Sequence, residues 1–79
     1  MRFAYILIKV NPGKLKEVAD RLIELEAVTE VYSTSGAYDL IAKVMVEDFD
    51  QFGEIIPQKI HAIAGIKETY TLITFNAFK

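Results

Sequence analysis

Polar groups gather in and near the stretch STSGAYDLI, residues 33–41. Gly36 lets the backbone adopt a positive φ and leaves its own amide accessible, and Asp39 places a carboxylate close to it. A carboxylate is suited to bind a ligand ammonium through a charge-assisted hydrogen bond. Hydroxyl groups that can donate or accept hydrogen bonds follow later in the chain, at Thr69, Thr71 and Thr74. These residue types predict a polar site for a ligand that carries an ammonium group.

The same residues also have a purely structural interpretation. The small residues 34–37 separate two apolar runs, as the loop of a β-hairpin does. Asp39 then caps its own turn, and the threonines are present because threonine favours strands. However, Tyr38 and Asp39 stand where the next strand should begin, and Asp is among the poorest strand formers. Both interpretations therefore stay open.

Other kinds of chemistry have little support in the sequence. The chain has no cysteine, which excludes disulfides and thiolate–metal sites, and no serine sits in a nucleophile-elbow motif. The single histidine, His61, is expected to be a surface or helix-end residue. No spacing typical of metal ligands occurs, and Gly36 does not belong to a phosphate-binding glycine pattern. We therefore expect no catalytic residue, no metal and no cofactor.

The length of 79 residues predicts one domain. The net charge is −2, and acidic residues alternate with basic ones, which argues against a nucleic-acid-binding surface. The apolar run FAYILI near the N-terminus is too short for a secretory signal or a membrane span, so we expect a cytoplasmic protein. Hydrophobic residues make up 52% of the chain. A small domain hides only about 60% of its surface, so this surplus predicts a partner subunit.

The first helix is predicted over residues 11–26. Asn11 is a suitable N-cap, and Pro12 fits the first helical position. Apolar residues recur at helical spacing and form one stripe, at Leu15, Val18, Ala19, Leu22 and Ile23. We interpret this segment as a packing helix.

A second helix is predicted to begin at Asp48, because Gln51 follows in capping-box spacing. Pro57 lies inside the apolar stripe of this helix and cannot donate the backbone hydrogen bond expected there, which predicts a kink or a break. Gly65 is expected to end the helix as a left-handed cap.

Four strands are predicted, over residues 2–10, 27–34, 38–46 and 66–78. The order βαββαβ is that of the ferredoxin-like fold, an α+β architecture with a four-stranded antiparallel sheet and two helices on one face. Strands one and three are the most continuously apolar and are expected to form the inner pair, running parallel to each other. The more polar strands two and four are expected at the edges.

Two helices cover only one face of such a sheet. We expect the uncovered face to carry Phe3, Tyr5 and Leu7, together with several Thr and Ile side chains. A face of this kind requires a second subunit against it, so a dimer resembling an α/β-barrel is predicted.

Two segments, TSGAYDLIAKV and GIKETYTLITF, resemble the ligand-binding domain of the Lrp/AsnC transcriptional regulators, called RAM. This domain typically shows a Thr-Gly-x-Tyr-Asp pattern after strand two, then Gly-Val, with Thr-x-Thr opening strand four. Ser35 stands where the family usually has Thr and keeps the hydroxyl. The resemblance covers essentially the whole chain, as one RAM domain over residues 1–79. The residues at family spacing are Gly36, Tyr38, Asp39, Gly65, Thr69 and Thr71.

The resemblance implies a function for these positions. Gly36 and Asp39 would hold the α-amino group of an amino-acid effector or nearby backbone, and Tyr38 would pack under the loop or line the pocket. Thr69 and Thr71 would bind the polar ends of the effector. In the family, domains pair into dimers, dimers assemble into rings such as octamers, and effectors bind at dimer–dimer contacts.

The sequence opens directly onto strand one, without the helix-turn-helix of full-length family regulators. This resembles stand-alone RAM proteins, which implies a module that modulates full-length Lrp/AsnC regulators and does not bind DNA itself. The alternative is a small dimeric α+β-barrel enzyme, with His61 and either Tyr5 or Tyr70 as the proton-transfer pair. An enzyme would gather these groups inside the cleft of one protomer, whereas a sensor would gather polar groups at the loop and at subunit contacts.

Overall fold

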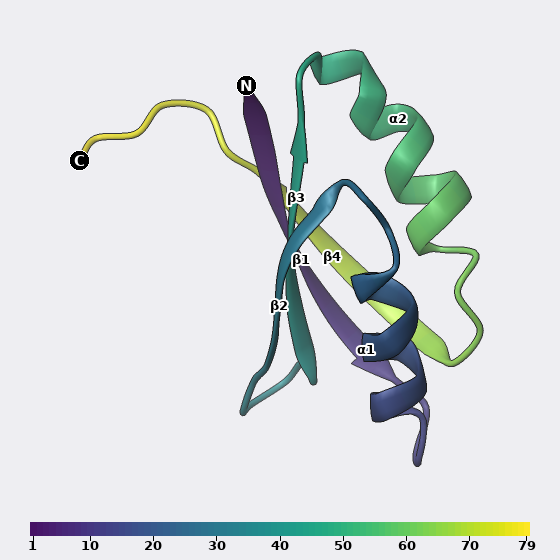
Figure 1. The fold of residues 1–79 in the computed structure, drawn as a ribbon. Coiled ribbons are helices and arrows are strands. Elements are labelled where there is room, and N and C mark those ends of the chain that lie inside the picture. The colour runs from purple at the N-terminus through teal and green to yellow at the C-terminus, as the bar shows by residue number, and fades with distance from the viewer.

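The computed structural model describes all residues, 1–79. A four-stranded sheet carries two helical segments on one face (Figure 1). The spatial order of the strands is β2-β3-β1-β4, which confirms the ferredoxin-like βαββαβ topology. The four strands are β1 (Arg2–Val10), β2 (Val28–Ser33), β3 (Leu40–Val46) and β4 (Ile66–Ile73). The first helical segment is helix α1 (Leu15–Ile23), and the second covers residues 49–60.

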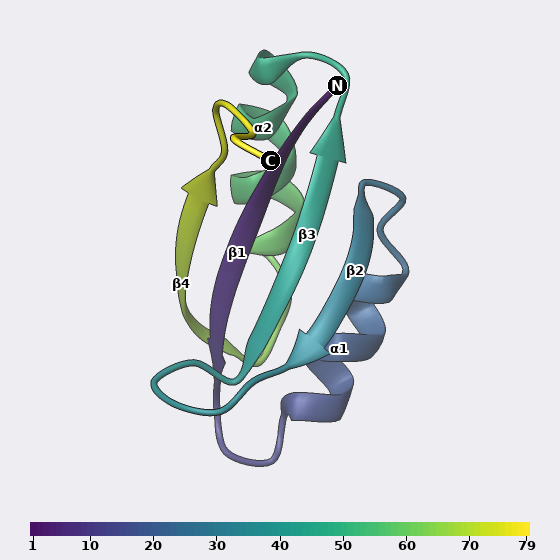
Figure 2. The ribbon, with the colours of Figure 1, turned by 90° about the vertical axis from the view of Figure 1, so that its left-hand side faces the viewer.

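All neighbouring strands are antiparallel, including the inner pair β1 and β3. The expectation that β1 and β3 run parallel was wrong. The crossover through α1 makes β1 and β2 point the same way, and the hairpin that follows β2 then reverses β3. β1 and β3 do occupy the centre of the sheet, as predicted (Figure 2).

The hydrophobic core lies between the sheet and the helices. In β1, buried residues alternate with partly exposed ones, because successive strand side chains point to opposite faces. β3 shows the same alternation. The twelve buried residues are Ala4, Ile6, Ile8, Val18, Leu22, Leu40, Ala42, Val44, Val46, Phe52, Ile56 and Ile60.

Helix α1 begins later than predicted, at Leu15 after an N-cap at Lys14. Asn11 is not the cap. It starts a turn in which its carbonyl accepts from the Lys14 N–H at 3.0 Å, and Gly13 has a φ of +79°, which a right-handed helix cannot include. The predicted stripe is also only partly buried, since Leu15 and Ile23 are exposed. The helix therefore packs mainly through Val18 and Leu22.

The second helical segment changes its geometry along residues 49–60. A 3₁₀ turn (η1, Phe49–Gln51) leads into α2 (Phe52–Glu54) and then into a π-helical stretch (η2, Ile55–Ile60). The Gln51 side-chain oxygen accepts from the Asp48 N–H at 3.0 Å, as a capping box requires. The helix does not break at Pro57. It widens there, and the His61 N–H donates to the carbonyl five residues back, on Ile56, at 2.9 Å.

Gly65 does not cap this helix, which ends at Ile60. It lies in the connection to β4 with the predicted positive φ, +101°. Its carbonyl accepts from the Asn11 N–H at 2.8 Å, so it joins the two loops at this end of the sheet.

Strand β4 ends at Ile73, whereas the sequence predicted a strand up to residue 78. The Thr74 hydroxyl donates to the Phe3 carbonyl at 2.8 Å, and the chain then leaves the sheet on the side away from the helices (Figure 1). Phe75 and Phe78 in this tail are exposed. The predicted strand was too long because the apolar residues of the tail do not pair with β1.

Candidate functional site

One face of the sheet, which we call the open face, has no helix against it. The pairing register places the partly buried Phe3, Tyr5 and Leu7 of β1 there, as predicted. Thr69 and Thr71 are opposite Ile8 and Ile6 and therefore face the helices, which corrects the expectation of threonines on the open face. The remaining apolar members of the open face come from the other strands and are Tyr32, Ile41, Met45, Tyr70 and Leu72.

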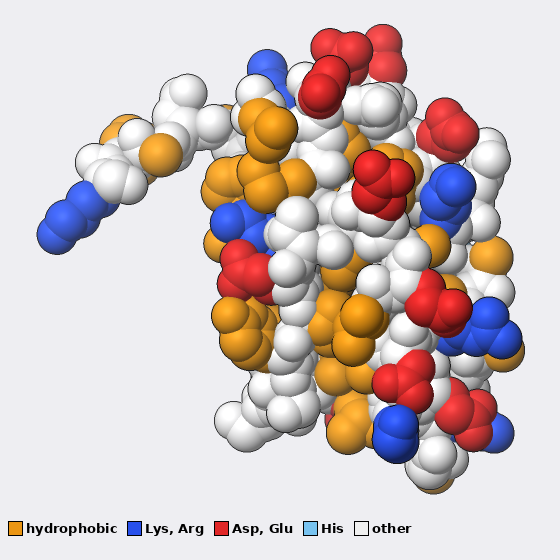
Figure 3. Space-filling view, viewed as in Figure 1, with side chains coloured by type: hydrophobic (Ala, Val, Ile, Leu, Met, Phe, Trp, Pro, Cys, Tyr) orange, Lys and Arg blue, Asp and Glu red, His pale blue; other side chains and the backbone are white.

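A small polar centre, formed by Glu30, Tyr32 and Lys43, interrupts the open face. The Lys43 Nζ lies 3.5 Å from a Glu30 carboxylate oxygen and 4.4 Å from the centroid of the Phe3 ring. The Tyr32 hydroxyl donates to the other Glu30 oxygen at 2.8 Å. This hydrogen bond and the negative charge of Glu30 raise the pKa of the Tyr32 hydroxyl above its ordinary value. Figure 3 shows hydrophobic side chains along the left edge of the molecule, with basic and acidic groups among them.

The predicted ligand-binding loop connects β2 and β3. Because β3 begins only at Leu40, Tyr38 and Asp39 belong to this loop. Asp39 therefore does not occupy a strand position, where Asp is disfavoured. The Thr34 hydroxyl donates to the Tyr38 carbonyl at 2.9 Å. Gly36 is exposed with a φ of +98°, and a Cβ there would meet nothing within 4 Å. The loop is thus held at its base and leaves open space beside the Gly36 backbone.

Asp39 is partly buried and ties the loop to the end of β1. Its Oδ2 accepts from the Val10 N–H at 2.9 Å, next to a register shift between Lys9 and Val10. Its own N–H donates to the Ile8 carbonyl at 2.8 Å. Within the chain the carboxylate forms no other hydrogen bond, so its second oxygen is free to accept from a ligand.

The threonines lie apart from the loop. Leu40 and Thr69 flank Ile8 from its two sides, so Thr69 is two strand spacings, about 10 Å, from the start of β3. Both lie at the same end of the sheet. Thr74 is not part of this end, because it bonds to the first residues of β1. Gly36, Tyr38 and Asp39 are therefore brought together in one loop, and Thr69 and Thr71 are not in direct contact with them.

His61 is a neighbour of this site that the sequence did not indicate. Its Nε2 lies 2.9 Å from the Thr69 hydroxyl oxygen. The π-helical stretch places His61 over β4. Its contact with Thr69 depends on the register of β4 against β1, which the sequence does not show. The proposed enzymatic pair is not formed, because Thr69 and His61 are on the helical side of the sheet, whereas Tyr5 and Tyr70 are on the open face.

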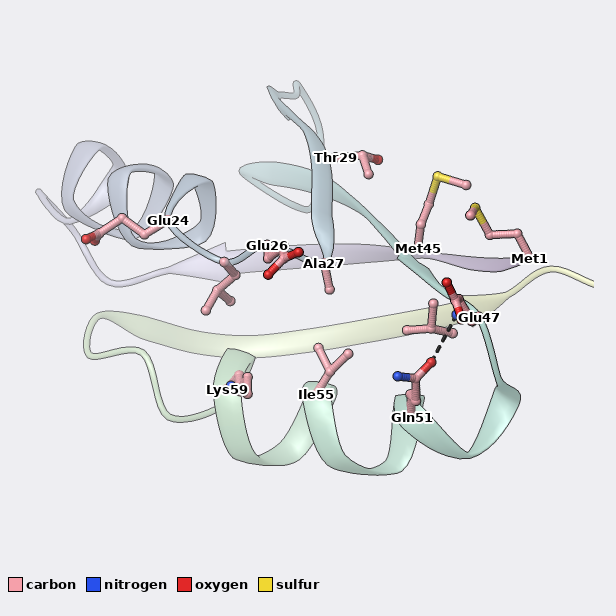
Figure 4. A pocket seen from close by; sticks show the side chains of 12 residues that line it. Met1, Glu24, Glu26, Ala27, Thr29, Met45, Glu47, Gln51, Ile55 and Lys59 are labelled. Atoms are coloured by element: carbon pink, nitrogen blue, oxygen red, sulfur yellow. Dashed lines mark hydrogen bonds between the residues drawn. The ribbon is translucent and has the colours of Figure 1, made fainter.

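A cavity lies far from the loop. It has a volume of about 650 Å³ and lies where α1 ends, β2 begins and β3 ends, against the second helical segment (Figure 4). β3 starts at the loop and ends at this cavity, so the two sites are at opposite ends of the strand. No pattern in the sequence indicated the cavity, whose lining mixes apolar side chains such as Met45 and Ile55 with Glu26, Glu47 and Lys59.

Comparison with known proteins identifies the family to which this fold and loop belong. The chain belongs to the Lrp/AsnC ligand-binding domain family, whose model matches residues 3–79. It is 37% identical over 76 residues to the HTH-type transcriptional regulator FL11 of Pyrococcus abyssi, a match that covers 96% of this chain and 50% of FL11. The chain thus spans about half the length of the curated relatives it matches.

Solved structures give the same result. TTHA0845 from Thermus thermophilus superposes with a TM-score of 0.94 at 33% identity, covering 100% of this chain and 99% of that one. E. coli AsnC superposes with a TM-score of 0.92 at 29% identity, covering 99% of this chain and 53% of AsnC. The resemblance seen in the sequence is confirmed. Neither helical segment has the length and apolar character that crossing a membrane demands.

Proposed function

We propose that this protein is a cytoplasmic, non-enzymatic module that binds an amino-acid effector and modulates Lrp/AsnC-type regulators. The observation that carries the proposal is the β2–β3 loop in a chain that is a ligand-binding domain throughout. In this loop the exposed Gly36 backbone lies close in sequence to an Asp39 carboxylate with one unused oxygen. An α-amino group and its neighbouring polar atoms match these two partners in charge and in hydrogen-bonding type.

The site is completed by a second subunit in this proposal. Gly36 is exposed on the surface of one chain, and the threonine hydroxyls of the same chain are about two strand spacings away. A ligand bound at the loop therefore has one open side. A neighbouring subunit covers this side, and Tyr38, Thr69 and Thr71 line the enclosed space together with Asp39.

Assembly begins with a dimer through the open face. Phe3, Tyr5 and Leu7 lie on the inner strand β1, beside Ile41 and Met45 of the other inner strand, β3, and together they present apolar surface. Burying a large apolar side chain contributes roughly 1.5–3 kcal/mol, so a second sheet against this face stabilises both chains. Further contacts between dimers give a ring, such as an octamer, in which the loops meet. The module does not contact DNA in this proposal, because its net charge of −2 disfavours binding to phosphates.

A thermal-shift screen against the twenty amino acids tests this function, with hits examined by native mass spectrometry. Ligand that binds only the folded protein raises the unfolding temperature, by an amount that grows with ligand concentration. We expect at least one amino acid to do so and to remain bound to dimers or larger particles. If none of the twenty shifts the unfolding temperature or is retained, the proposed effector is not an amino acid.

A further inference from the structure

The polar centre of the open face has an unusual position for charged side chains. Lys43 lies on the inner strand β3, directly opposite Tyr5 of β1, and Ile41 and Met45 flank it on the same face. Only 22% of its side chain is exposed, compared with 42% for Glu30. Charged groups this close to the middle of an apolar face become desolvated when that face is covered.

Loss of water from Glu30 and Lys43, when a partner covers the open face, makes the stability of the complex depend on the charges that the partner presents. An ion that loses water in an interface costs free energy unless an opposite charge or hydrogen bonds replace the water. The open face carries one charge of each sign side by side, so its charge pattern is complementary to itself. In a two-fold contact each residue meets the same partner twice, so Lys43 of each copy can meet Glu30 of the other.

From this arrangement we propose that Glu30 and Lys43 select the occupant of the open face. The occupant is a second copy of this chain, and domains of the same fold with other charges at these two positions are rejected. Such a domain sets a like charge against Lys43 or Glu30, which disfavours the complex. This inference rests on the dimer in the proposed function and adds its rule of partner choice.

The double variant Glu30→Lys with Lys43→Glu separates partner choice from folding. It keeps the cross-strand ion pair within the chain, so its fold should be preserved. Two copies of the double variant are again complementary to each other. A mixed dimer with the wild type, however, brings lysine against lysine and glutamate against glutamate.

The experiment refolds equal amounts of the ¹⁵N-labelled wild type and the unlabelled double variant together, and native mass spectrometry then counts the dimers. We expect mixed dimers to be less than about a tenth of the particles instead of the statistical half, because like-charge contacts in an interface are costly. The matched control is Lys16→Asp with Asp20→Lys, which swaps an exposed pair on α1 whose charged atoms are 3.0 Å apart. It should mix statistically with the wild type.

The outcomes distinguish this inference from the function on which it rests. A dimeric wild type that mixes statistically with the Glu30→Lys, Lys43→Glu variant overturns partner selection and leaves the dimer in place. A wild type that stays monomeric overturns both. Sorting that appears equally with the α1 control also contradicts the proposal, because it would not come from the open face.

Discussion

The carboxylate of Asp39 has two oxygen atoms, and the fold uses one of them. From the sequence alone, Asp39 could be a turn residue or a ligand-binding group, and local spacing could not decide between them. Its contact with the Val10 N–H joins residues 29 positions apart. Such a contact follows from the register of β1 against β3, which no local pattern specifies. The structural role of Asp39 is thus established, and its ligand role depends on the second oxygen.

The hydroxyl of Tyr32 offers a test of the polar centre at the scale of single atoms. Glu30 raises its pKa, first through their hydrogen bond and second through its charge. The stabilisation of the folded state by this contact is therefore present below about pH 10, the ordinary tyrosine pKa, and is lost as the pH rises through the higher folded-state pKa. Glu30→Gln should lower the titration midpoint of Tyr32 towards its ordinary value.

Absorbance at 295 nm measures this titration, and a Tyr32→Phe variant identifies which part of the signal of the four tyrosines belongs to Tyr32. An identical Tyr32 midpoint in the wild type and Glu30→Gln would show that the negative charge of Glu30 does not act on the Tyr32 hydroxyl in solution.

Among the elements, β1 was predicted with its true bounds, because it is a nearly continuous apolar run with no breaker inside it. Elements whose ends depend on a single backbone angle or a distant partner were predicted less well. The start of α1 depends on the positive φ of Gly13. The end of β4 depends on where pairing with β1 stops, at Ile73 opposite Ala4. The loop residues of the candidate site could be identified from their types, whereas the contact of His61 with Thr69 required the tertiary structure.

Gly65 links the elements at the loop end of the sheet, and its replacement should be costly. A Cβ at Gly65 would lie 3.0 Å from a methyl group of Val18 and 3.1 Å from the Lys14 Cβ, at a φ of +101°. Gly65→Ala should therefore lower the free energy of unfolding by about 1–3 kcal/mol, from the backbone strain alone. Urea denaturation monitored by circular dichroism measures the change.

Gly53→Ala is the matched control. Gly53 is in α2, and a Cβ there meets nothing within 4 Å. This substitution should leave stability unchanged or raise it by about 0.4–1 kcal/mol, because alanine loses less backbone entropy than glycine on folding. Equal effects of the two substitutions would mean that Gly65 does not hold the positive φ in solution.

For the whole molecule, the open face predicts a dimer that a single charge should disrupt. Leu7 is on β1, opposite Ile41 and Tyr70, and Leu7→Lys would bury an ammonium without a partner in the subunit contact. The variant should shift from dimer to monomer and unfold at a lower temperature than the wild type. Sedimentation velocity measures the size, and Ile23→Lys, on the exposed side of α1, should remain dimeric. A Leu7→Lys protein that dimerises as tightly as the wild type would place the interface elsewhere.

The central claim is that the assembled protein binds an amino acid through Asp39, and calorimetry of the Asp39→Asn variant tests it most directly. Asparagine can still accept from the Val10 N–H, so the fold and the assembly should be retained. The charge is lost, however, and a hydrogen bond to a charged group contributes about 1.5–3 kcal/mol. With the amino acid found in the screen, we expect binding to weaken roughly ten- to hundred-fold, while Asp20→Asn, on the exposed surface of α1, binds like the wild type. An unchanged dissociation constant for Asp39→Asn would contradict the account and leave Asp39 with its structural role only.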